Sequence, residues 1–475
     1  MQIETEGVVP NIPEEDSHDF ANEIGLAVDV GTSTVAVSAW SLKSRKCLAT
    51  VAEKNAQIRY GYDVIRRISF ATRAPLLGSA QVIESGSSAL HYSIINQLEK
   101  MFVKVVNLVA TKFARGIRPE VKRIVITGNT TMLSFVCAVP VDGLSVAPFS
   151  PSTLFGFSAY WENVRSGNVI ENSVVLDAPT PDTLKLYETS VIPPETPIFF
   201  PPCIGAFIGA DTVCAMLSAG FPSPIRISDN IENLETSVKS PLLLADIGTN
   251  TEIALFIPAT EKSAAKILCT SAAAGPAFEA SNISCGMSSI EGAIDSISYN
   301  GDLVCHVIGD TNAKGICGSG LISAGATLLK HKYIDRNGVI QKSVSKLGDG
   351  SICIQLTPAV YLSQQDIRNM QLAKSAVKTG LAYMVERAPA LPIFCLAGGF
   401  GSNINITEAC EIGLIPSELE RRCVSLGNAA LAGASALLFS KVLRRKSIEI
   451  AKNAYQINLA AVPDFQQRYL NSIDF

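Results

Sequence analysis

The sequence predicts an α/β protein built from two related lobes, and three observations support this fold class. The chain has 475 residues, more than one hydrophobic core usually serves, so two or more domains are expected. Apolar residues make up 47% of the chain and charged residues 17%, as in a well-buried globular protein. One short motif also occurs twice: it reads L-A-V-D-V-G-T-S-T-V-A-V over Leu26–Val37 and L-L-L-A-D-I-G-T-N-T-E-I-A-L-F over Leu242–Phe256.

Each copy of the motif predicts a strand, a short polar turn and a second strand that can hold a phosphate. An apolar run ends in Asp29 or Asp246, a glycine follows, and hydroxyl or amide residues lead into the next apolar run. Glycine lets the backbone approach an anion, and a carboxylate at the strand end reaches Mg²⁺ through water. One such turn alone is more often an ordinary hairpin. Two copies far apart suggest two halves that face each other across one nucleotide.

Composition excludes several classes of partner. A net charge of −4 and a pI near 5.8 give no electrostatic reason to expect nucleic acid or an anionic membrane. The twelve cysteines form no C-x-x-C cluster, and several lie singly inside apolar runs, where a reduced cysteine behaves as a small hydrophobe. We therefore expect no disulfide framework and a cytoplasmic location.

No targeting or membrane segment is expected. Residues 1–23 are acidic, contain no Lys or Arg and have no apolar centre, which predicts a flexible tail rather than a secretory signal. The most apolar span, Pro197–Phe221, is interrupted by Pro201, Pro202 and Asp211, which fits a segment buried in protein better than one in lipid.

The first lobe is expected over residues 24–235. After the first hairpin come a strand over 47–52, a helix over 63–71 with Arg66 and Arg67 facing outward, and a long amphipathic helix over 87–114. Residues 123–136 predict a strand, a Gly-Asn turn and a helix capped by Thr130; this turn is either a ligand-binding strand end or an ordinary connection. A helix following Gly205 carries small residues on one face, which implies close packing against a partner.

The second lobe is expected over residues 236–475, after a polar stretch at 228–240. Its elements are the second hairpin, a Gly-Pro turn at 271–279, a glycine-rich loop entering a helix at 315–324, and a helix at 366–386. A buried strand at 392–403 ends in a double glycine where a nucleoside can lie against the backbone. A second small-faced helix at 425–438 is the expected mate of the helix after Gly205.

The order of these parts resembles the actin, sugar kinase and Hsp70 ATPase superfamily, whose two lobes close on ATP. Longer phrases are similar to one family within it, the ATP-dependent reductive activators of corrinoid proteins, over Ile24–Phe475. The phrases are N-A-Q…G-Y-D-V-I-R-R-I, I-T-G-N-T-T-M, A-P-F-S-P, A-A-G-P-A-F-E, I-S-C-G-M, D-I-R-N-M-Q-L-A-K, L-A-G-G-F-G-S-N and G-L-I-P.

This resemblance implies an actin/Hsp70-like fold with duplicated mixed sheets flanked by helices. It also implies a task, the return of a Co(II) corrinoid protein of a methyltransferase system to the Co(I) state, and a homodimer. Family members typically carry an N-terminal [2Fe–2S] domain, which needs a C-x₄-C-x₂-C…C run that this sequence lacks. We therefore expect no iron–sulfur cluster in this chain and a separate low-potential electron donor. Two other departures are Ser134, where the family has a histidine, and Glu279-Ala280-Ser281 in place of E-G-A.

The site residues follow from the motifs together with the resemblance. ATP is the expected nucleotide and Mg²⁺ the expected metal, with Asp211 or Glu279 orienting the attacking water against the alternative of a capping or helix-end role. Asp29 and Asp246 are the expected metal ligands, and the expected nucleotide contacts are Gly31, Thr32, Ser33, Gly248, Thr249, Asn250, Gly398, Gly399 and Gly401.

Two other functions remain open at this point. A chaperone-like ATPase could use the same lobes to reactivate a B12-dependent enzyme without redox chemistry. A small-molecule kinase of the same superfamily would need a general base beside a substrate hydroxyl.

Overall fold

The computed structural model describes residues 22–73, 85–113, 118–171, 174, 176–221, 240–342, 344–398 and 404–475. These residues form two compact units. The first unit comprises the chain up to Gly220 together with Ala429–Ala454, and the second comprises Phe221–Asn428 and Tyr455–Phe475. No helix among the described residues is long and apolar enough to cross a membrane.

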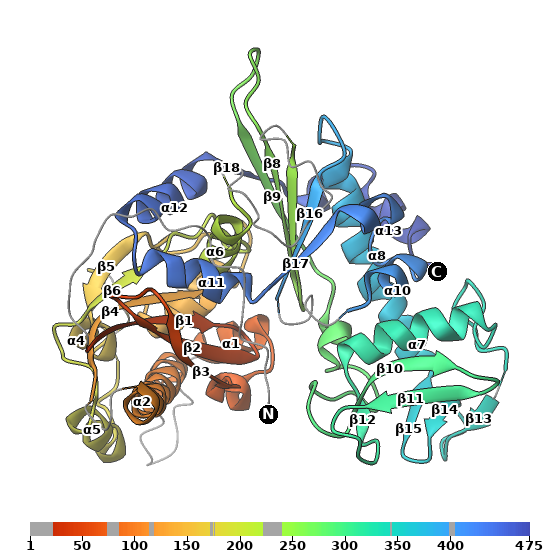
Figure 1. Ribbon diagram of the computed structural model, residues 1–475, viewed down its shortest axis with the longest axis horizontal. Helices are drawn as coiled ribbons and strands as arrows, with labels where there is room; N and C mark the ends of the chain where they lie inside the picture. The colour runs from red at the N-terminus through yellow and green to blue at the C-terminus, as the bar shows by residue number, and fades with distance from the viewer. Residues whose placement is uncertain are drawn as a thin grey trace. The chain divides into compact units, whose positions relative to one another are not determined.

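The first unit is built on a six-stranded mixed sheet in the order β3-β2-β1-β4-β6-β5 (Figure 1). Strands β1, β2 and β3 are antiparallel neighbours, β4 and β6 run parallel to β1, and β5 closes the edge antiparallel to β6. The first hairpin motif forms β1 and β2, as expected. The strands are β1 (Glu23–Val30), β2 (Thr34–Ser41), β3 (Cys47–Lys54), β4 (Glu120–Gly128), β5 (Phe157–Tyr160) and β6 (Pro197–Phe200).

Helices cover both faces of this sheet (Figure 1). Helix α2 (Gly86–Phe113) packs along β2 and β3, and its apolar stripe lies in the same buried cluster as Leu26 and Val28 of β1. Helices α6 (Ala210–Ser218) and α11 (Ala429–Leu437) pack against the opposite face. The other helices are α1 (Val64–Ala71), α3 (Thr130–Val136), α4 (Trp161–Arg165), α5 (Pro181–Glu188) and α12 (Lys441–Asn453), with short 3₁₀ turns η1 (Ala56–Tyr60) and η2 (Asp142–Leu144).

The expected pairing of the two small-faced helices is confirmed, because α6 and α11 pack together. A Cβ atom on Gly433 would lie 2.0 Å from the carbonyl oxygen of Cys214, so the two backbones approach as closely as glycine permits. This packing brings residues 429–454 into the first unit, whereas we expected the second lobe to run unbroken over 236–475. A local pattern reveals that a helix needs a close neighbour but not on which unit that neighbour lies.

The second unit repeats the topology of the first. Its main sheet has the order β17-β16-β7-β8-β9-β18, in which β7, β8 and β9 are antiparallel and β16 and β17 run parallel to β7. The run β9-β8-β7-β16-β17 therefore matches β3-β2-β1-β4-β6, which confirms duplicated mixed sheets. The strands are β7 (Leu242–Ile247), β8 (Thr251–Ile257), β9 (Lys266–Ala272), β16 (Ile393–Ala397), β17 (Cys423–Gly427) and β18 (Ala454–Gln456).

Among the described residues, two three-stranded sheets and four helices complete the second unit. The small sheets have the orders β11-β10-β12 and β13-β14-β15, formed by β10 (Ala293–Tyr299), β11 (Leu303–Val307), β12 (Gly315–Ile316), β13 (Val344–Lys346), β14 (Ile352–Thr357) and β15 (Val360–Ser363). The helices are α7 (Gly318–Lys330), α8 (Gln364–Val385), α10 (Ile406–Glu411) and α13 (Phe465–Asn471), with 3₁₀ turns η3 (Pro276–Glu279), η4 (Ser417–Arg422) and η5 (Leu459–Ala461).

Several expected boundaries were wrong by a few residues. Helix α6 begins only at Ala210, because Gly205–Gly209 form a loop, and residues 425–427 belong to strand β17 rather than to the following helix. Asn129, not Thr130, caps α3, since its Oδ1 accepts the Met132 N–H at 2.9 Å. Residues 1–21 of the expected tail and most of the expected boundary stretch at 228–240 lie outside the described residues.

Candidate functional site: two phosphate-type hairpins

The first hairpin turn, Gly31–Ser33, lies between the end of β1 and the start of β2. A Cβ atom on Gly31 would lie 2.7 Å from the Thr34 carbonyl oxygen, so the turn can close this tightly only with glycine. Two side chains of the N-A-Q…R-R-I phrase donate hydrogen bonds to the carbonyl groups of this turn. Asn55 donates from Nδ2 to the Gly31 carbonyl at 2.8 Å, and Arg67 donates from Nη2 to the Thr32 carbonyl at 2.6 Å.

The expected orientation of Arg67 was wrong. Arg66 does face outward, where it pairs with Asp63 at 3.5 Å and lies over the Tyr62 ring, but Arg67 is completely buried. Helix α1 turns instead so that Ile65 is 66% exposed. A buried guanidinium is tolerated where carbonyl oxygens accept its N–H groups, and the Gly61 and Thr32 carbonyls do so here.

The turn after β4 also belongs to this region. Asn129 donates from Nδ2 to the Thr32 hydroxyl at 3.1 Å while its Oδ1 caps α3. The Thr130 hydroxyl donates to the Gly205 carbonyl at 2.6 Å, which ties α3 to the loop before α6. The G-N-T-T turn therefore connects the first hairpin with that loop. Ser134, by contrast, is buried in α3 and donates to the Thr130 carbonyl at 2.8 Å.

Asp29 and Asp211 both act electrostatically on the Cys214 thiol of α6. Both carboxylates raise the pKa of the Cys214 thiol, in addition to the larger effect of its burial. Asp211 accepts the Thr212 N–H at 2.7 Å, and burial raises its own pKa to about 6. A carboxylate with this pKa can accept a proton near neutral pH, as a residue that orients an attacking water requires.

The second hairpin turn, Gly248–Asn250, has a different environment. Asp246 stands at the end of β7, where a Cβ atom on Gly398 would lie 2.4 Å from its Oδ1 atom. Gly398 also has a φ of +88°, which L-residues rarely adopt. Only glycine therefore fits between β16 and the Asp246 carboxylate.

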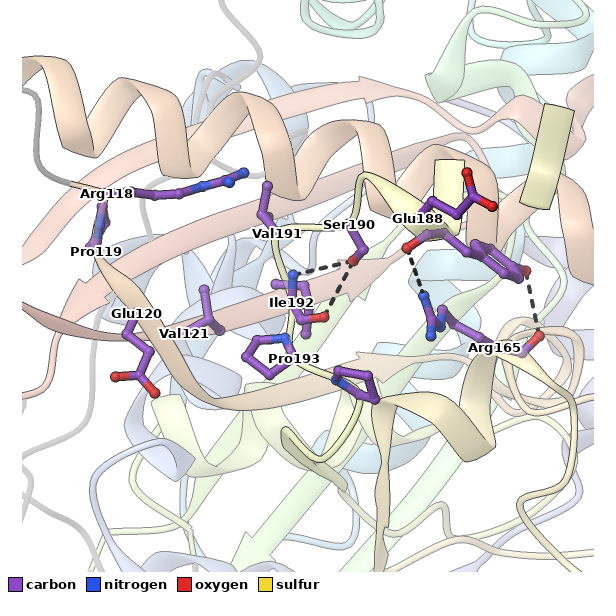
Figure 2. A pocket seen from close by; sticks show the side chains of 12 residues that line it. Arg118, Pro119, Glu120, Val121, Arg165, Glu188, Ser190, Val191, Ile192 and Pro193 are labelled. Carbon is purple, nitrogen blue, oxygen red and sulfur yellow. Dashed lines mark hydrogen bonds between the residues drawn. The ribbon is translucent and has the colours of Figure 1, made fainter. Parts of the chain in front are cut away.

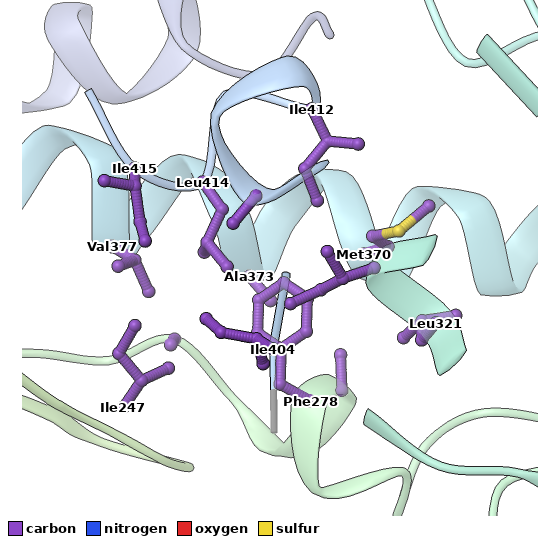
Figure 3. Packing of buried hydrophobic residues seen from close by; sticks show 14 of the residues in the cluster. Ile247, Phe278, Leu321, Met370, Ala373, Val377, Ile404, Ile412, Leu414 and Ile415 are labelled. Carbon is purple, nitrogen blue, oxygen red and sulfur yellow. The ribbon is translucent and has the colours of Figure 1, made fainter. Parts of the chain in front are cut away.

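Glu279 touches the second turn directly. Its Oε1 atom accepts the Thr249 N–H at 2.8 Å, and the Gly275 N–H donates to the Thr249 carbonyl at 2.8 Å. Phe278 anchors this segment, because its buried ring lies among Leu321, Met370 and other core side chains in Figure 3. Ala280 has a φ of +59°, a conformation that favours glycine, at the position where we noted a departure from E-G-A.

The predicted site residues fall into three groups: one lies in the first unit, one lies in the second unit, and one lies outside the residues that the structure describes. The first unit holds Asp29, Gly31, Thr32, Ser33 and Asp211, and the second holds Asp246, Gly248, Thr249, Asn250, Glu279 and Gly398. Gly399 and Gly401 lie outside the described residues. Asn55, Arg67 and Asn129 hydrogen-bond to the first turn but were not predicted to lie there, although the family phrases contain them.

The donor set of each turn fits a nucleotide with magnesium. Both turns combine a glycine that permits close approach with hydroxyl and N–H donors, and each follows a strand that ends in a carboxylate. Mg²⁺ keeps several waters and needs only one or two protein carboxylates beside phosphate oxygens. Among the described residues there is no group of three or more His, Cys, Asp or Glu side chains that could hold a metal ion.

All twelve cysteines are described, and each is a free thiol. Most are partly or fully buried, and burial raises the pKa of Cys203 and of Cys395 to about 12. These two thiols are therefore protonated at neutral pH, a state that neither attacks nor ligates a metal.

A cavity of about 470 Å³ lies at the start of strand β4 (Figure 2). The other end of this strand, Gly128, pairs with Val30 beside the Gly31 turn. It is lined by Glu120 and Val121 at the start of the strand and by the segment Ser190–Pro194. Its two arginines, Arg118 and Arg165, are matched by two glutamates, so its charge favours neither an anion nor a cation. Because the phosphate-type turns lie elsewhere, the cavity is not part of the candidate site.

Comparison with models of known protein families identifies the family of the chain. A model of the RACo middle region matches residues 24–175, and a model of the C-terminal ASKHA domain of RACo matches residues 240–475. The chain belongs to the RACo family. Both matches include a hairpin motif, and the ASKHA domain is the superfamily module of actin, sugar kinases and Hsp70, in agreement with the duplicated sheets.

Individual relatives are similar along almost the whole chain. A corrinoid activation enzyme, RamQ, of Eubacterium limosum is 27% identical over 475 residues, which cover 95% of this chain and 70% of the relative. The [Co(II) methylated amine-specific corrinoid protein] reductase of Methanosarcina barkeri is 26% identical over 481 residues, covering 95% and 77%. A solved structure of a reductive activator for a corrinoid, iron–sulfur protein superposes with a TM-score of 0.73 at 25% identity, covering 96% of this chain and 67% of that one.

Proposed function

We propose that this chain is an ATP-dependent activator that helps to return a Co(II) corrinoid protein of a methyltransferase system to the Co(I) state. The proposal depends mainly on one observation, the pair of hairpins in a chain of the RACo family. In each hairpin an aspartate lies at the end of the first strand and a glycine allows the tight turn that follows. The names of its relatives, a corrinoid activation enzyme and a corrinoid protein reductase, supply the proposed substrate class.

The proposed nucleotide contacts come from both hairpins. Asp29 and Asp246 hold Mg²⁺, which neutralises phosphate charge, and Asp211 or Glu279 orients the attacking water. Asp211 has a pKa near 6, and Glu279 is already bound to a turn amide. The phosphates are assigned to Gly31, Thr32, Ser33, Gly248, Thr249 and Asn250, and the adenosine to Gly398, Gly399 and Gly401.

ATP is needed because Co(I) is difficult to reach. A tenfold bias in a one-electron equilibrium corresponds to about 59 mV, so a deficit of a few hundred millivolts requires several kcal/mol. A chain that binds the corrinoid protein differently before and after hydrolysis can supply that free energy by shifting the population of its states. The proposed electron source is a separate low-potential iron–sulfur protein, and the proposed working form is a cytoplasmic homodimer.

The test is the absorption spectrum of a Co(II) corrinoid protein incubated with this chain, Mg-ATP and a low-potential reductant. We expect Co(I) to appear only when chain and ATP are both present, and an Asp246→Asn variant to remove the effect. Co(I) formation that is equally fast without the chain or without ATP would contradict the proposal. Release of damaged cofactor without reduction would favour the chaperone-like alternative, and a phosphorylated metabolite would favour a kinase.

A further inference from the structure

Three successive carbonyl groups of the first turn accept hydrogen bonds from Asn55 and Arg67. The Gly31 carbonyl accepts from Asn55 Nδ2 at 2.8 Å, the Thr32 carbonyl from Arg67 Nη2 at 2.6 Å, and the Ser33 carbonyl from the Asn55 backbone N–H at 3.0 Å. In a planar trans peptide the C=O of one residue and the N–H of the next point in opposite directions. The N–H groups of Thr32 and Ser33 therefore point away from Asn55 and Arg67.

Arg67 is a buried cation that pairs with no carboxylate among the described residues. Its Nε donates to the Gly61 carbonyl at 2.8 Å and its Nη1 to Gln57 Oε1 at 3.3 Å, while the Met132 sulfur lies 3.1 Å from Nη1. Asp63 acts on it only at longer range and pairs with Arg66 instead. Burial lowers the pKa of Arg67 to about 10, so the guanidinium keeps its charge at neutral pH.

An anion near the first turn would offset the cost of this buried charge. A buried ion without a counter-ion destabilises its surroundings, and its field is screened less in the interior than in water. The charge of Arg67 acts on the turn through the Thr32 carbonyl. A hydrogen bond donated to a carbonyl oxygen polarises the whole peptide group, so the N–H of that group becomes a stronger donor. That N–H belongs to Ser33.

We propose that Arg67 is a positioning residue for the nucleotide phosphates: it fixes and polarises the Gly31–Ser33 turn from behind and supplies the positive charge that the bound phosphates balance. Asn55 supports the same turn through the Gly31 and Ser33 carbonyls. The inference rests on the proposed function, since it takes the phosphates of ATP as the anion. It predicts that Arg67 acts on phosphate binding although its side chain is buried behind the turn.

The neighbouring arginine offers a matched control. Arg67→Gln removes the buried charge, and Arg66→Gln removes an equal charge from the surface of the same helix turn. We expect Arg67→Gln to weaken Mg-ATP binding by tenfold or more in calorimetric titration and to change the affinity for adenosine, measured by competition, by less than twofold. Arg66→Gln should bind both ligands like the unaltered chain. A purely structural role for Arg67 would weaken both ligands together.

Arg67→Lys keeps the charge but loses the planar fork that spans the Thr32 and Gly61 carbonyls. It should retain part of the preference for ATP over adenosine, and this ratio decides the test if Arg67→Gln does not fold. A ratio of ATP to adenosine affinity that is unchanged in the folded Arg67 variants would overturn the inference while leaving the proposed function intact. An unaltered chain that binds no Mg-ATP would instead contradict the proposed function itself.

Discussion

The two hairpins share a sequence motif but differ in what surrounds their turns. At the first turn, the carbonyls of Gly31 and Thr32 accept from Asn55 and from the cation of Arg67. At the second turn, the Thr249 N–H donates to the carboxylate of Glu279. The D-x-G-T motif therefore specifies the path of the backbone, whereas residues distant in sequence specify the local charge.

This difference divides the expected chemistry between the turns. A turn braced by a buried cation, with its amides facing away from that cation, suits a phosphate. A turn with one amide occupied by a carboxylate binds phosphate more weakly, because phosphate and carboxylate repel each other, and that carboxylate suits a metal-bound water or the attacking water. We therefore expect phosphate affinity to depend more on the first turn and hydrolysis more on the second.

The largest effect is expected at Glu279. A Glu279→Gln variant keeps an oxygen that can accept the Thr249 N–H but removes the negative charge, so the turn is preserved while water activation is lost. We expect the rate of ATP hydrolysis to fall by about 10²-fold, with ATP affinity unchanged or improved. Phosphate release assays and calorimetry measure the two quantities. Glu261→Gln, an exposed change on the same unit, is the control, and an unaltered rate in Glu279→Gln would assign the water to another residue.

The next effect is expected at Asn55. Asn55→Asp keeps the acceptor that caps η1, since the Gln57 N–H donates to Oδ1 at 2.9 Å, but loses the donor to Gly31 and adds a negative charge. ATP affinity should fall about tenfold, equivalent to about 1.4 kcal/mol. The exposed Asn453→Asp change on the same unit has the same formal charge and should leave binding unaltered. Equal affinities in the two variants would remove the distinction between the turns.

The pH dependence tests Asp211, whose pKa is about 6. If this carboxylate orients the water, hydrolysis falls as it protonates below pH 6, by about tenfold for each further unit. A pH–rate profile without this limb, together with a normal rate in Asp211→Asn, would exclude the role.

The same residue makes a prediction about stability. Because the folded-state pKa is raised above the unfolded value of 3.8, the folded state binds the proton more tightly, and stability decreases as pH rises from about 4 to about 6. Asp211→Asn should therefore raise the melting temperature most above pH 6, and the gain should shrink toward pH 4. A gain that is independent of pH would contradict the raised pKa.

Substitution of the two turn glycines is expected to act on stability. A Cβ atom on Gly31 would meet the Thr34 backbone oxygen at 2.7 Å, whereas one on Gly248 would meet Glu279 Oε1 at 3.0 Å. A side chain can move and a strand backbone cannot, so Gly31→Ala should cost about 1–3 kcal/mol and Gly248→Ala less than about 1 kcal/mol. Chemical denaturation measures both, and Gly348→Ala, which meets no atom within 4 Å, is the control. A larger cost at Gly248 would mean that Glu279 is held rigidly.

Local patterns predicted the main elements of each unit. The repeated motif predicted β1–β2 and β7–β8, and amphipathic spacing predicted α2. An acidic start followed by basic residues predicted α8, and the small residues of α6 and α11 predicted their pairing. These features depend on residues close together in the chain. The return of residues 429–454 to the first unit was not predicted, because it depends on which long-range surface the glycine face of α11 meets.

The supports of the two turns were also beyond local patterns. An arginine on an amphipathic helix normally faces water, and Arg67 is buried only because the Gly61 and Thr32 carbonyls happen to converge on it. Glu279 was named as a candidate, but its contact with Thr249 spans 30 residues and has no local signature. Neighbours of this kind are set by tertiary structure, and the functional difference that we expect between the turns depends on them.

The most direct test of the division between the turns is a parallel measurement of ATP affinity and hydrolysis rate in Arg67→Gln and Glu279→Gln. We predict opposite responses: Arg67→Gln loses affinity tenfold or more and hydrolyses near the original rate when saturated, while Glu279→Gln binds ATP at least as tightly and hydrolyses about 10²-fold more slowly. Equal losses of affinity in both variants, or no change in either, would contradict the account.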